Sequence, residues 1–405
     1  MEPENLPSVP ATQPDEVPPP APPLPDDSGL EALAPFPTLA EAAMPPTPQG
    51  PPEPGTLPWF FIGPNGLRSG WSIAIFIPLM VLLSSLVGAV LYFARLIGQH
   101  PGHSSPRGAF FGEVILLSGL VGAAAIVALI ERRKRNLLEY NLIGPHRVQN
   151  FIVGLLAGFV ALTALVEALK TGGWLTIASS GLATPQLLKY AVLWGLMFLM
   201  VGFYEEGTFR CFLQATWTRG INLWWALGIQ ALMCGGLMIF GKGNGIWGVY
   251  LIALLGLGPC LWLALNKAES TGFWLAAWVA STLFGAIHTG NNGENWIGIF
   301  AAAAIGFVFA VSVKLTGSAW WAIGFHAAWD WAETYFYGTA DSGMQAQGSF
   351  MLSKPLGNNP FWSGGADGPE GSVLVLAVIL LTLVGILLAY GRCTKAKEQD
   401  QLPQA

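Results

Sequence analysis

Two adjacent glutamates, Glu205 and Glu206, lie in an otherwise apolar stretch of the chain, LWGLMFLMVGFYEEGTFRCFL. A carboxylate at membrane depth is costly, so it normally faces the protein interior and has a function there. Arg210 follows Glu206 by four residues, which places both side chains on one helical face and allows them to pair. Glu205 is rotated by about 100° on the same helix. It would therefore be free to act as a general base toward water.

Two other apolar segments carry one histidine each, and the chain has only five histidines. His288 ends the motif Phe284-Gly-Ala-Ile-His288, and His326 begins the motif His326-Ala-Ala-Trp-Asp330. Because Asp330 lies four residues after His326, its carboxylate can orient the imidazole or accept the second N–H. An isolated histidine of this kind is usually a satisfied interior or interfacial residue. Carboxylates, an arginine and two histidines together, on three apolar segments, predict hydrolytic chemistry inside a membrane.

The composition places these residues in an integral membrane protein. Of the 405 residues, 53% are hydrophobic and only 11% are charged, whereas a soluble domain has about 25% charged residues. We expect an all-α fold, a polytopic transmembrane helical bundle of about eight to ten spans. Apolar runs of about 20 residues lie near residues 71–96, 110–130, 151–169, 186–208, 222–240, 246–265, 273–289, 296–313, 319–337 and 372–391.

The run at 185–217 is too long for one straight span, and it predicts either a long tilted helix or a span followed by an interfacial turn. The loop at 338–371 is rich in Gly, Ser, Asn and Pro and is expected to be a polar loop outside the membrane. The transmembrane helical domain is expected over residues 69–392, followed by a short C-terminal tail at 393–405.

Residues 1–68 are expected to form a disordered, Pro-rich, acidic tail. Residues 1–58 contain nine acidic residues, no Lys or Arg, and 19 of the 30 prolines. A segment of this composition cannot bury a hydrophobic core. A solvated tail is the preferred interpretation, and a Pro-rich segment that binds a partner protein is the alternative.

The basic residues predict the orientation of the chain in the membrane. The strongest cluster is RRKR at 132–135, and the positive-inside rule places it, and with it both termini, in the cytoplasm. A simple alternation of ten spans then puts Glu205 and His326 in the inner half of the membrane and His288 near the outer end. Since groups that act together must share a depth, we expect either a re-entrant segment within 222–265 or a helix boundary displaced by one turn.

The order EExxxR, FxxxH and HxxxN/D resembles the intramembrane proteases of the CPBP family (CAAX protease and bacteriocin-processing), which are related to the type II CAAX prenyl endopeptidases. The resemblance covers about 185–337, and KLTGSAWW followed by GFHAAWDW looks especially like the end of the family core. It implies an endopeptidase that cuts a peptide bond in or next to the membrane. In that family Glu205 would activate the attacking water, assisted by His288. His326 and Asp330 would stabilise the oxyanion or position the substrate.

Two features depart from the family pattern. Asp330 stands where eukaryotic members typically carry Asn, and His288 follows Glu205 by 83 positions, which is a long gap. Metal dependence is open, because Glu205, His288, His326 and Asp330 could together hold a zinc ion. No HExxH motif is present, and the four cysteines form no CxxC pair. The preferred mechanism requires no cofactor.

Two other classes of function remain open. A non-catalytic scaffold or immunity protein of the same family would tolerate the loss of a motif residue, and none of the main positions is lost. A proton-coupled transporter would use Glu205, Glu206, His288 and His326 as a relay, but the repeat symmetry typical of transporters is not found. The expected partners are a peptide or protein substrate that reaches the lipid bilayer, and no nucleic acid. The expected location is a bacterial plasma membrane.

Overall fold

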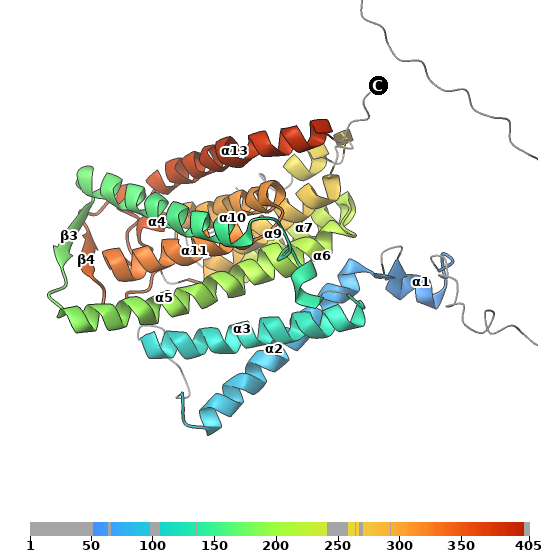
Figure 1. Cartoon of the computed structure of the whole chain (residues 1–405), viewed down its shortest axis with the longest axis horizontal. Coiled ribbons are helices and arrows are strands. Elements are labelled where there is room, and N and C mark those ends of the chain that lie inside the picture. The colour runs from blue at the N-terminus through green and yellow to red at the C-terminus, as the bar shows by residue number, and fades with distance from the viewer. Residues whose placement is uncertain are drawn as a thin grey trace, which may run out of the picture. The chain divides into compact units, whose positions relative to one another are not determined.

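The computed structural model describes residues 52–63, 66–97, 106–133, 136–240, 258–263, 265–266, 270–291 and 293–400 (Figure 1). Its longer helices are α2 (Ser69–Phe93), α3 (Pro106–Ile130), α4 (Arg147–Thr171), α5 (Thr184–Glu206), α7 (Leu223–Phe240), α9 (Thr271–Ile287), α10 (Trp296–Thr316), α11 (Trp320–Trp331) and α13 (Leu374–Asp400). Shorter helical elements are α1 (Leu57–Phe61), η1 (Asn136–Glu139), η2 (Gly207–Leu213), α6 (Gln214–Thr218), η4 (His288–Gly290), η5 (Ala332–Tyr337), α12 (Pro360–Ser363) and η6 (Pro369–Gly371). The strands are β1 (Ile62–Gly63), β2 (Gly66–Leu67), β3 (Leu175–Ser179) and β4 (Met351–Pro355).

The predicted all-α membrane fold is confirmed. In the part of the chain that the structure describes, six helices are long and apolar enough to cross a membrane: 69–93, 106–130, 147–171, 184–218, 296–316 and 374–391. The predicted segments at 222–240, 273–289 and 319–337 form α7, α9 and α11 with η5. Most of the predicted segment at 246–265 lies outside the described residues. The count of eight to ten spans therefore stays a prediction.

The run at 185–217 forms one helix of 35 residues, Thr184–Thr218, composed of α5, η2 and α6. This is the first of the two predicted alternatives, a long helix. The η2 segment is π-helical and begins directly after Glu206. A π-helical turn holds an additional residue, which changes the direction of the side chains that follow, and such turns occur frequently at functional sites.

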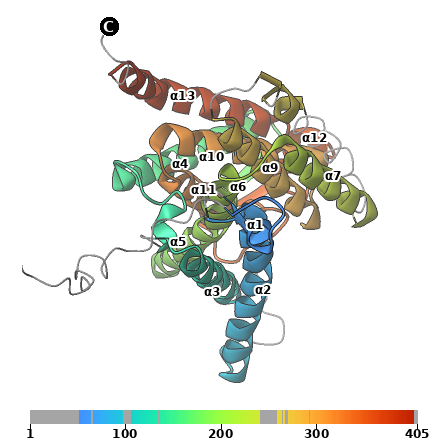
Figure 2. The same cartoon turned by 90° about the vertical axis from the view of Figure 1, so that its right-hand side faces the viewer.

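Helix α11, which carries His326, packs against α4, α5 and α10, and Figures 1 and 2 show it among these helices. Glycines explain how closely it approaches them. A Cβ at Gly154 or Gly158 of α4 would collide with the α11 backbone at Trp321 and Phe325. Small residues four apart let membrane helices approach backbone to backbone. The position of α11 is therefore set by direct contact between backbones.

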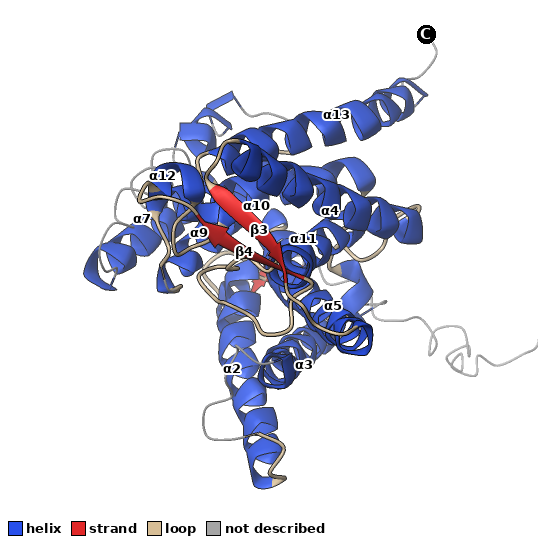
Figure 3. Ribbon diagram, turned by 90° about the vertical axis from the view of Figure 1, so that its left-hand side faces the viewer, coloured by secondary structure: helices blue, strands red, loops and turns tan. Residues whose placement is uncertain are grey.

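The loop at 338–371 is more ordered than a polar excursion. Strand β4 in this loop pairs with β3, antiparallel, from Leu175 opposite Pro355 to Ser179 opposite Met351. Figure 3 shows these two strands crossing the ends of the helices. Ser353 and Asp367 of this loop are buried. Local patterning could not predict the sheet, because the paired residues of its two short strands are 172 to 180 positions apart and the strands contain polar as well as apolar residues.

Secondary structure continues on both sides of the predicted boundaries at 69 and 392, and the domain boundaries themselves stay predictions. Residues 57–67, inside the predicted tail, form α1 and the antiparallel pair β1–β2. At the other end, α13 continues to Asp400. The predicted tail at 1–51 lies outside the described residues, so its disorder and its partner stay predictions.

Candidate active site

One cavity of about 450 Å³ collects the chemical groups that the sequence singled out. Glu205, His288, His326 and Asp330 all line it, together with apolar side chains of α3, α5, α9, α10, α11 and α13. The prediction that these groups share one place is confirmed. The two predicted explanations of the apparent conflict in depth, a re-entrant segment within 222–265 or a displaced helix boundary, stay predictions, because residues 241–257 lie outside the described part of the chain.

His326 lies at the centre of the polar contacts. Its Nδ1 is 2.8 Å from Oε1 of Glu206. Its Nε2 is 3.6 Å from Oε2 of Glu205 and 3.5 Å from Oδ2 of Asp330. A carboxylate only accepts hydrogen bonds, so Nδ1–H donates to Glu206 and Nε2 faces the cavity between the other two carboxylates. The predicted pairing of His326 with Asp330 on one helical face is confirmed.

Glu206 also forms the predicted ion pair with Arg210. Oε2 of Glu206 lies 3.2 Å from Nε of Arg210, and both side chains are fully buried. The two atoms are not aligned as a hydrogen bond, so the contact is an ion pair by distance. The amide of Asn141 donates to the Arg210 backbone carbonyl over 2.6 Å. Arg210 is therefore held at both its backbone and its side chain.

Aromatic rings surround the Arg210 guanidinium. Its Cζ lies 4.6 Å from the ring centroid of Phe284 and 5.5 Å from that of Phe309. Cation–π contacts of this kind stabilise a desolvated cation. Gly306 of α10 provides the space, because a Cβ there would collide with a terminal nitrogen of Arg210. The glycine, the rings and Glu206 form one tightly packed binding site for a single guanidinium.

We expect Gly306→Ala to destabilise the protein and to reduce its activity. The added methyl group forces Arg210 away from Glu206, and overpacking a tight interior costs about 1–3 kcal/mol. The measurement is a thermal unfolding curve in detergent. Gly385→Ala on α13 is the matched control, because a Cβ at Gly385 meets no atom within 4 Å. Equal melting temperatures for the two variants would show that Arg210 does not need this space.

His288 has a defined tautomer in this geometry. Its Nδ1 lies 2.7 Å from the backbone carbonyl oxygen of Phe284, and a carbonyl only accepts. The neutral imidazole therefore donates from Nδ1 and has its lone pair on Nε2. The FxxxH spacing explains the contact, since the two residues are four apart at the end of α9. The Phe284 ring lies 4.7 Å from the His288 ring and 6.1 Å from the His326 ring, so it contacts both imidazoles.

The cavity also contains carboxylates that the sequence motifs did not predict. They are Glu113, Glu294, Asp341 and Glu370. Burial raises the pKa of Glu294 to about 7, and the charge on His288 opposes that rise. Burial, with the charge of Glu294, raises the pKa of Asp367 to about 10.

The predicted zinc ligands do not form a compact set. Among the described residues, a group of three possible ligands within 4.8 Å of one another is found elsewhere, at Glu333, Asp341 and Glu370. Nδ1 of His326 and Nδ1 of His288 are both engaged by protein oxygens, which leaves Nε2 of each imidazole available to water or to a metal ion. The zinc alternative stays untested, and no chemical step is routed through zinc.

A comparison with known families decides the relationship of this segment of the chain. Residues 260–332 match the family described as Type II CAAX prenyl endopeptidase Rce1-like. This segment is similar to the Rce1-like family. It contains His288, His326 and Asp330, and Glu205 and Glu206 lie outside it. The match agrees with the resemblance carried by the three motifs.

No curated protein and no solved structure matches the chain. The Rce1-like family is a family of proteases, and the apolar helices identify an integral membrane protein. The matched segment includes α9, α10 and α11, which supply both histidines of the cavity. The glutamates come from α5, so the candidate site combines the matched segment with a helix that precedes it.

Proposed function

We propose that the protein is an intramembrane endopeptidase that hydrolyses a peptide bond in or next to the membrane, using water activated by Glu205. One observation carries the proposal: Glu205 and Glu206 are adjacent, yet their environments differ. Glu206 is buried and contacts both Arg210 and His326, whereas the Glu205 side chain is 25% exposed and lines the cavity. A general base needs that kind of access to water and substrate.

The proposed reaction begins when the Glu205 carboxylate takes a proton from water. The resulting hydroxide attacks the carbonyl carbon of the scissile peptide, and the carbonyl oxygen becomes an oxyanion. The C–N bond then breaks, and Glu205 returns the proton to the leaving amine. His288 supports the first step, because its Nε2 has a free lone pair that can orient the water.

His326 and Asp330 act on the carbonyl oxygen of the substrate in the proposed reaction. When His326 is protonated, its Nε2–H can donate to the developing oxyanion, which is the type of interaction that contributes most to acyl-transfer catalysis. Asp330 then acts through His326 rather than as an oxyanion donor, because an ionised carboxylate only accepts. Its 3.5 Å contact with Nε2 supports this positioning role. Glu206 and Arg210 hold the other side of the imidazole.

The location and partners of the enzyme are part of the same proposal. Both termini lie in the cytoplasm, as the basic cluster at 132–135 favours, and the membrane is a bacterial plasma membrane. The substrate is a peptide or protein that reaches the bilayer. The Pro-rich tail is a solvated segment, with partner binding as the alternative.

The test uses the full chain in liposomes with a fluorogenic, farnesylated CAAX peptide and, separately, an unprenylated transmembrane peptide. We expect cleavage of at least one probe. The cleavage rate should be unchanged by 1,10-phenanthroline, which removes transition-metal ions such as zinc. Loss of cleavage with phenanthroline, restored by zinc, would contradict the metal-free mechanism. Absence of cleavage of either probe would contradict the protease function itself.

A further inference from the structure

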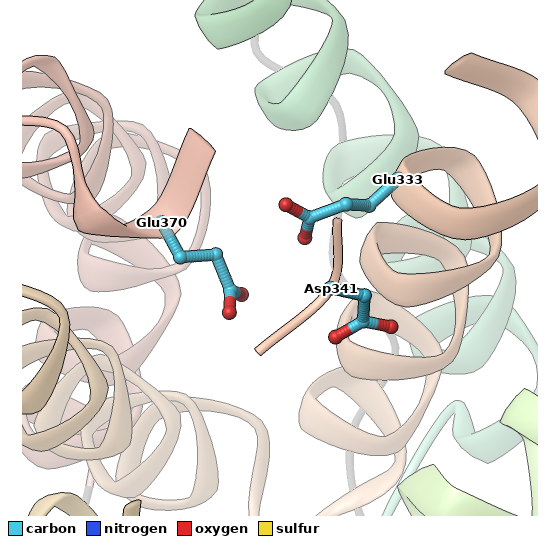
Figure 4. Close-up of side chains that lie close together, drawn as sticks. All are labelled: Glu333, Asp341 and Glu370. Atoms are coloured by element: carbon cyan, nitrogen blue, oxygen red, sulfur yellow. The ribbon is translucent and has the colours of Figure 1, made fainter. Parts of the chain in front are cut away.

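The proposed reaction does not use a cluster of three carboxylates that lies at the wall of the cavity. Glu333 lies in η5, Asp341 follows it in the next loop, and Glu370 lies in η6 just before α13. One oxygen of each lies within 4.8 Å of the others. Figure 4 shows the three carboxylates facing a common space. Residues that converge in this way from three segments resemble ligands around an ion.

Glu333 provides an independent indication of a ligand. Its side chain is fully buried, with a residue exposure of 0%. Neither of its carboxylate oxygens has a hydrogen-bond partner among the described residues. Buried polar groups are normally satisfied, and one that is not calls for an explanation such as an ion or a water. Since Glu333 points into the cluster (Figure 4), its missing partner would lie between the three carboxylates.

The other two carboxylates are already held in place. The Thr334 hydroxyl donates to Oδ2 of Asp341 over 2.8 Å. The Trp329 indole N–H donates to Oε1 of Glu370 over 2.8 Å, and the Ser342 hydroxyl donates to Oε2 over 3.3 Å. Outer-shell hydrogen bonds of this kind orient the ligands of metal sites. Each of these carboxylates has acceptor capacity left for an ion.

In the part of the chain that the structure describes, no cationic side chain is in direct contact with the cluster. Within the described ranges, no Lys, Arg or His forms a salt bridge with Glu333, Asp341 or Glu370. Three carboxyl groups this close together and away from bulk water can all be ionised only if a positive charge compensates them. A positive ion that is not part of the chain would supply that charge.

We propose that Glu333, Asp341 and Glu370 bind one hard divalent cation, with Ca²⁺ as the best-fitting ion. All three ligands are carboxylate oxygens, which suit Ca²⁺, Mg²⁺ and Mn²⁺ rather than zinc or copper. Ca²⁺ binds oxygens at about 2.3–2.6 Å, so opposite ligands lie up to about 5 Å apart. The three oxygens lie within 4.8 Å of one another, which is within that span, and Ca²⁺ tolerates irregular carboxylate geometry, whereas Mg²⁺ demands a near-ideal octahedron.

The ion would connect elements that surround the candidate active site. It joins η5, which directly follows α11, to the next loop and to the start of α13. Asp341 and Glu370 line the cavity themselves, and Trp329 on α11 donates to Glu370. We infer that the cation fixes this wall of the cavity. The inference does not depend on proteolysis.

Ca²⁺ binding to the full-length protein in detergent tests this inference. The protein is stripped with EGTA, and ⁴⁵Ca²⁺ binding and intrinsic tryptophan melting curves are recorded as CaCl₂ or MgCl₂ is added. We expect one Ca²⁺ per chain, a melting temperature that rises with Ca²⁺ concentration, and weaker binding of Mg²⁺. Absence of both Ca²⁺ binding and a melting shift would overturn the proposal.

Three variants locate the ion. Glu333→Gln should abolish the Ca²⁺-dependent shift and, without Ca²⁺, melt at or near the wild-type temperature, because a neutral amide of the same shape replaces a buried carboxyl group that has no partner. Thr334→Val leaves the ligands intact but frees Asp341, and should weaken Ca²⁺ binding by about 10–100-fold. Glu167→Gln, on the exposed face of α4, should leave binding unchanged. If Glu333→Gln keeps the full Ca²⁺ response, or if Glu167→Gln loses it, the ion binds elsewhere and the assignment is wrong.

Discussion

Glu205→Gln is expected to lower the rate of peptide cleavage by about 100-fold or more while the protein stays folded. The substitution keeps the shape of the side chain but removes the base, and a positioned general base typically contributes about 10²–10⁴-fold. Little stability should be lost, because the Glu205 carboxylate is partly exposed and its nearest charged group, Nε2 of His326, lies 3.6 Å away. The measurement is the cleavage rate in liposomes beside a melting curve in detergent.

Glu113→Gln is the matched control for this variant. Glu113 lies on α3 and lines the same cavity as Glu205. It has no ion pair or hydrogen bond with either cavity histidine among the described contacts. We expect Glu113→Gln to keep most of the activity. If Glu113→Gln is inactive and Glu205→Gln is active, the general base lies on α3 and the role given to Glu205 is wrong.

Glu206→Gln is expected to lose both stability and activity. Arg210 is fully buried, and removing one partner of a buried ion pair typically costs about 3–5 kcal/mol because the other charge is left uncompensated. His326 also loses its anionic partner at Nδ1. The measurement is the free energy of unfolding in detergent, together with cleavage in liposomes.

The matched control is a second ion pair in the chain with the same nitrogen–oxygen distance as the Glu206–Arg210 pair. Glu167 and Lys170 on α4 form an ion pair of 3.2 Å, equal to the Glu206–Arg210 distance, but their side chains are about half exposed. Exposed pairs contribute about 0–1 kcal/mol, so Glu167→Gln should cost little. The double variant Glu206→Gln/Arg210→Met should recover part of the lost stability, because no unpaired charge remains. Equal costs for the Glu206 and Glu167 variants would show that burial does not control this pair.

The local parts of the site could be predicted from the sequence, because helical spacing determines them. Residues four apart share a helical face, and this predicted the contacts of Glu206 with Arg210 and of His326 with Asp330. The same rule explains why Nδ1 of His288 meets the carbonyl of Phe284. In these cases the interacting atoms belong to consecutive turns of one helix.

Contacts between distant segments could not be predicted in this way. The contact of His326 with Glu206 joins residues 120 apart, and it depends on the glycines that let α11 approach α4 and α5. The pairing of β3 with β4 and the positions of Asp341 and Glu370 depend on how the 338–371 loop folds. Spacing along the chain contains no information on these contacts.

Glu113 and Glu333 differ from these long-range contacts, because the sequence did contain a signal that could have singled them out. Each lies in a predicted apolar segment, at 110–130 and 319–337, where the cost of a buried charge indicates a function. The argument that singled out Glu205 and Glu206 applies equally to them. It missed them because neither belongs to one of the three motifs.

Isotope incorporation tests the central claim most directly, namely that Glu205 activates a water molecule for peptide hydrolysis in this cavity. The wild-type protein and Glu205→Gln are incubated in liposomes with the cleavable peptide in H₂¹⁸O, and the products are weighed by mass spectrometry. We predict one ¹⁸O atom in the new carboxyl terminus of the wild-type product and almost no product from Glu205→Gln. Equal product from both proteins, or a wild-type product without ¹⁸O, would contradict the account.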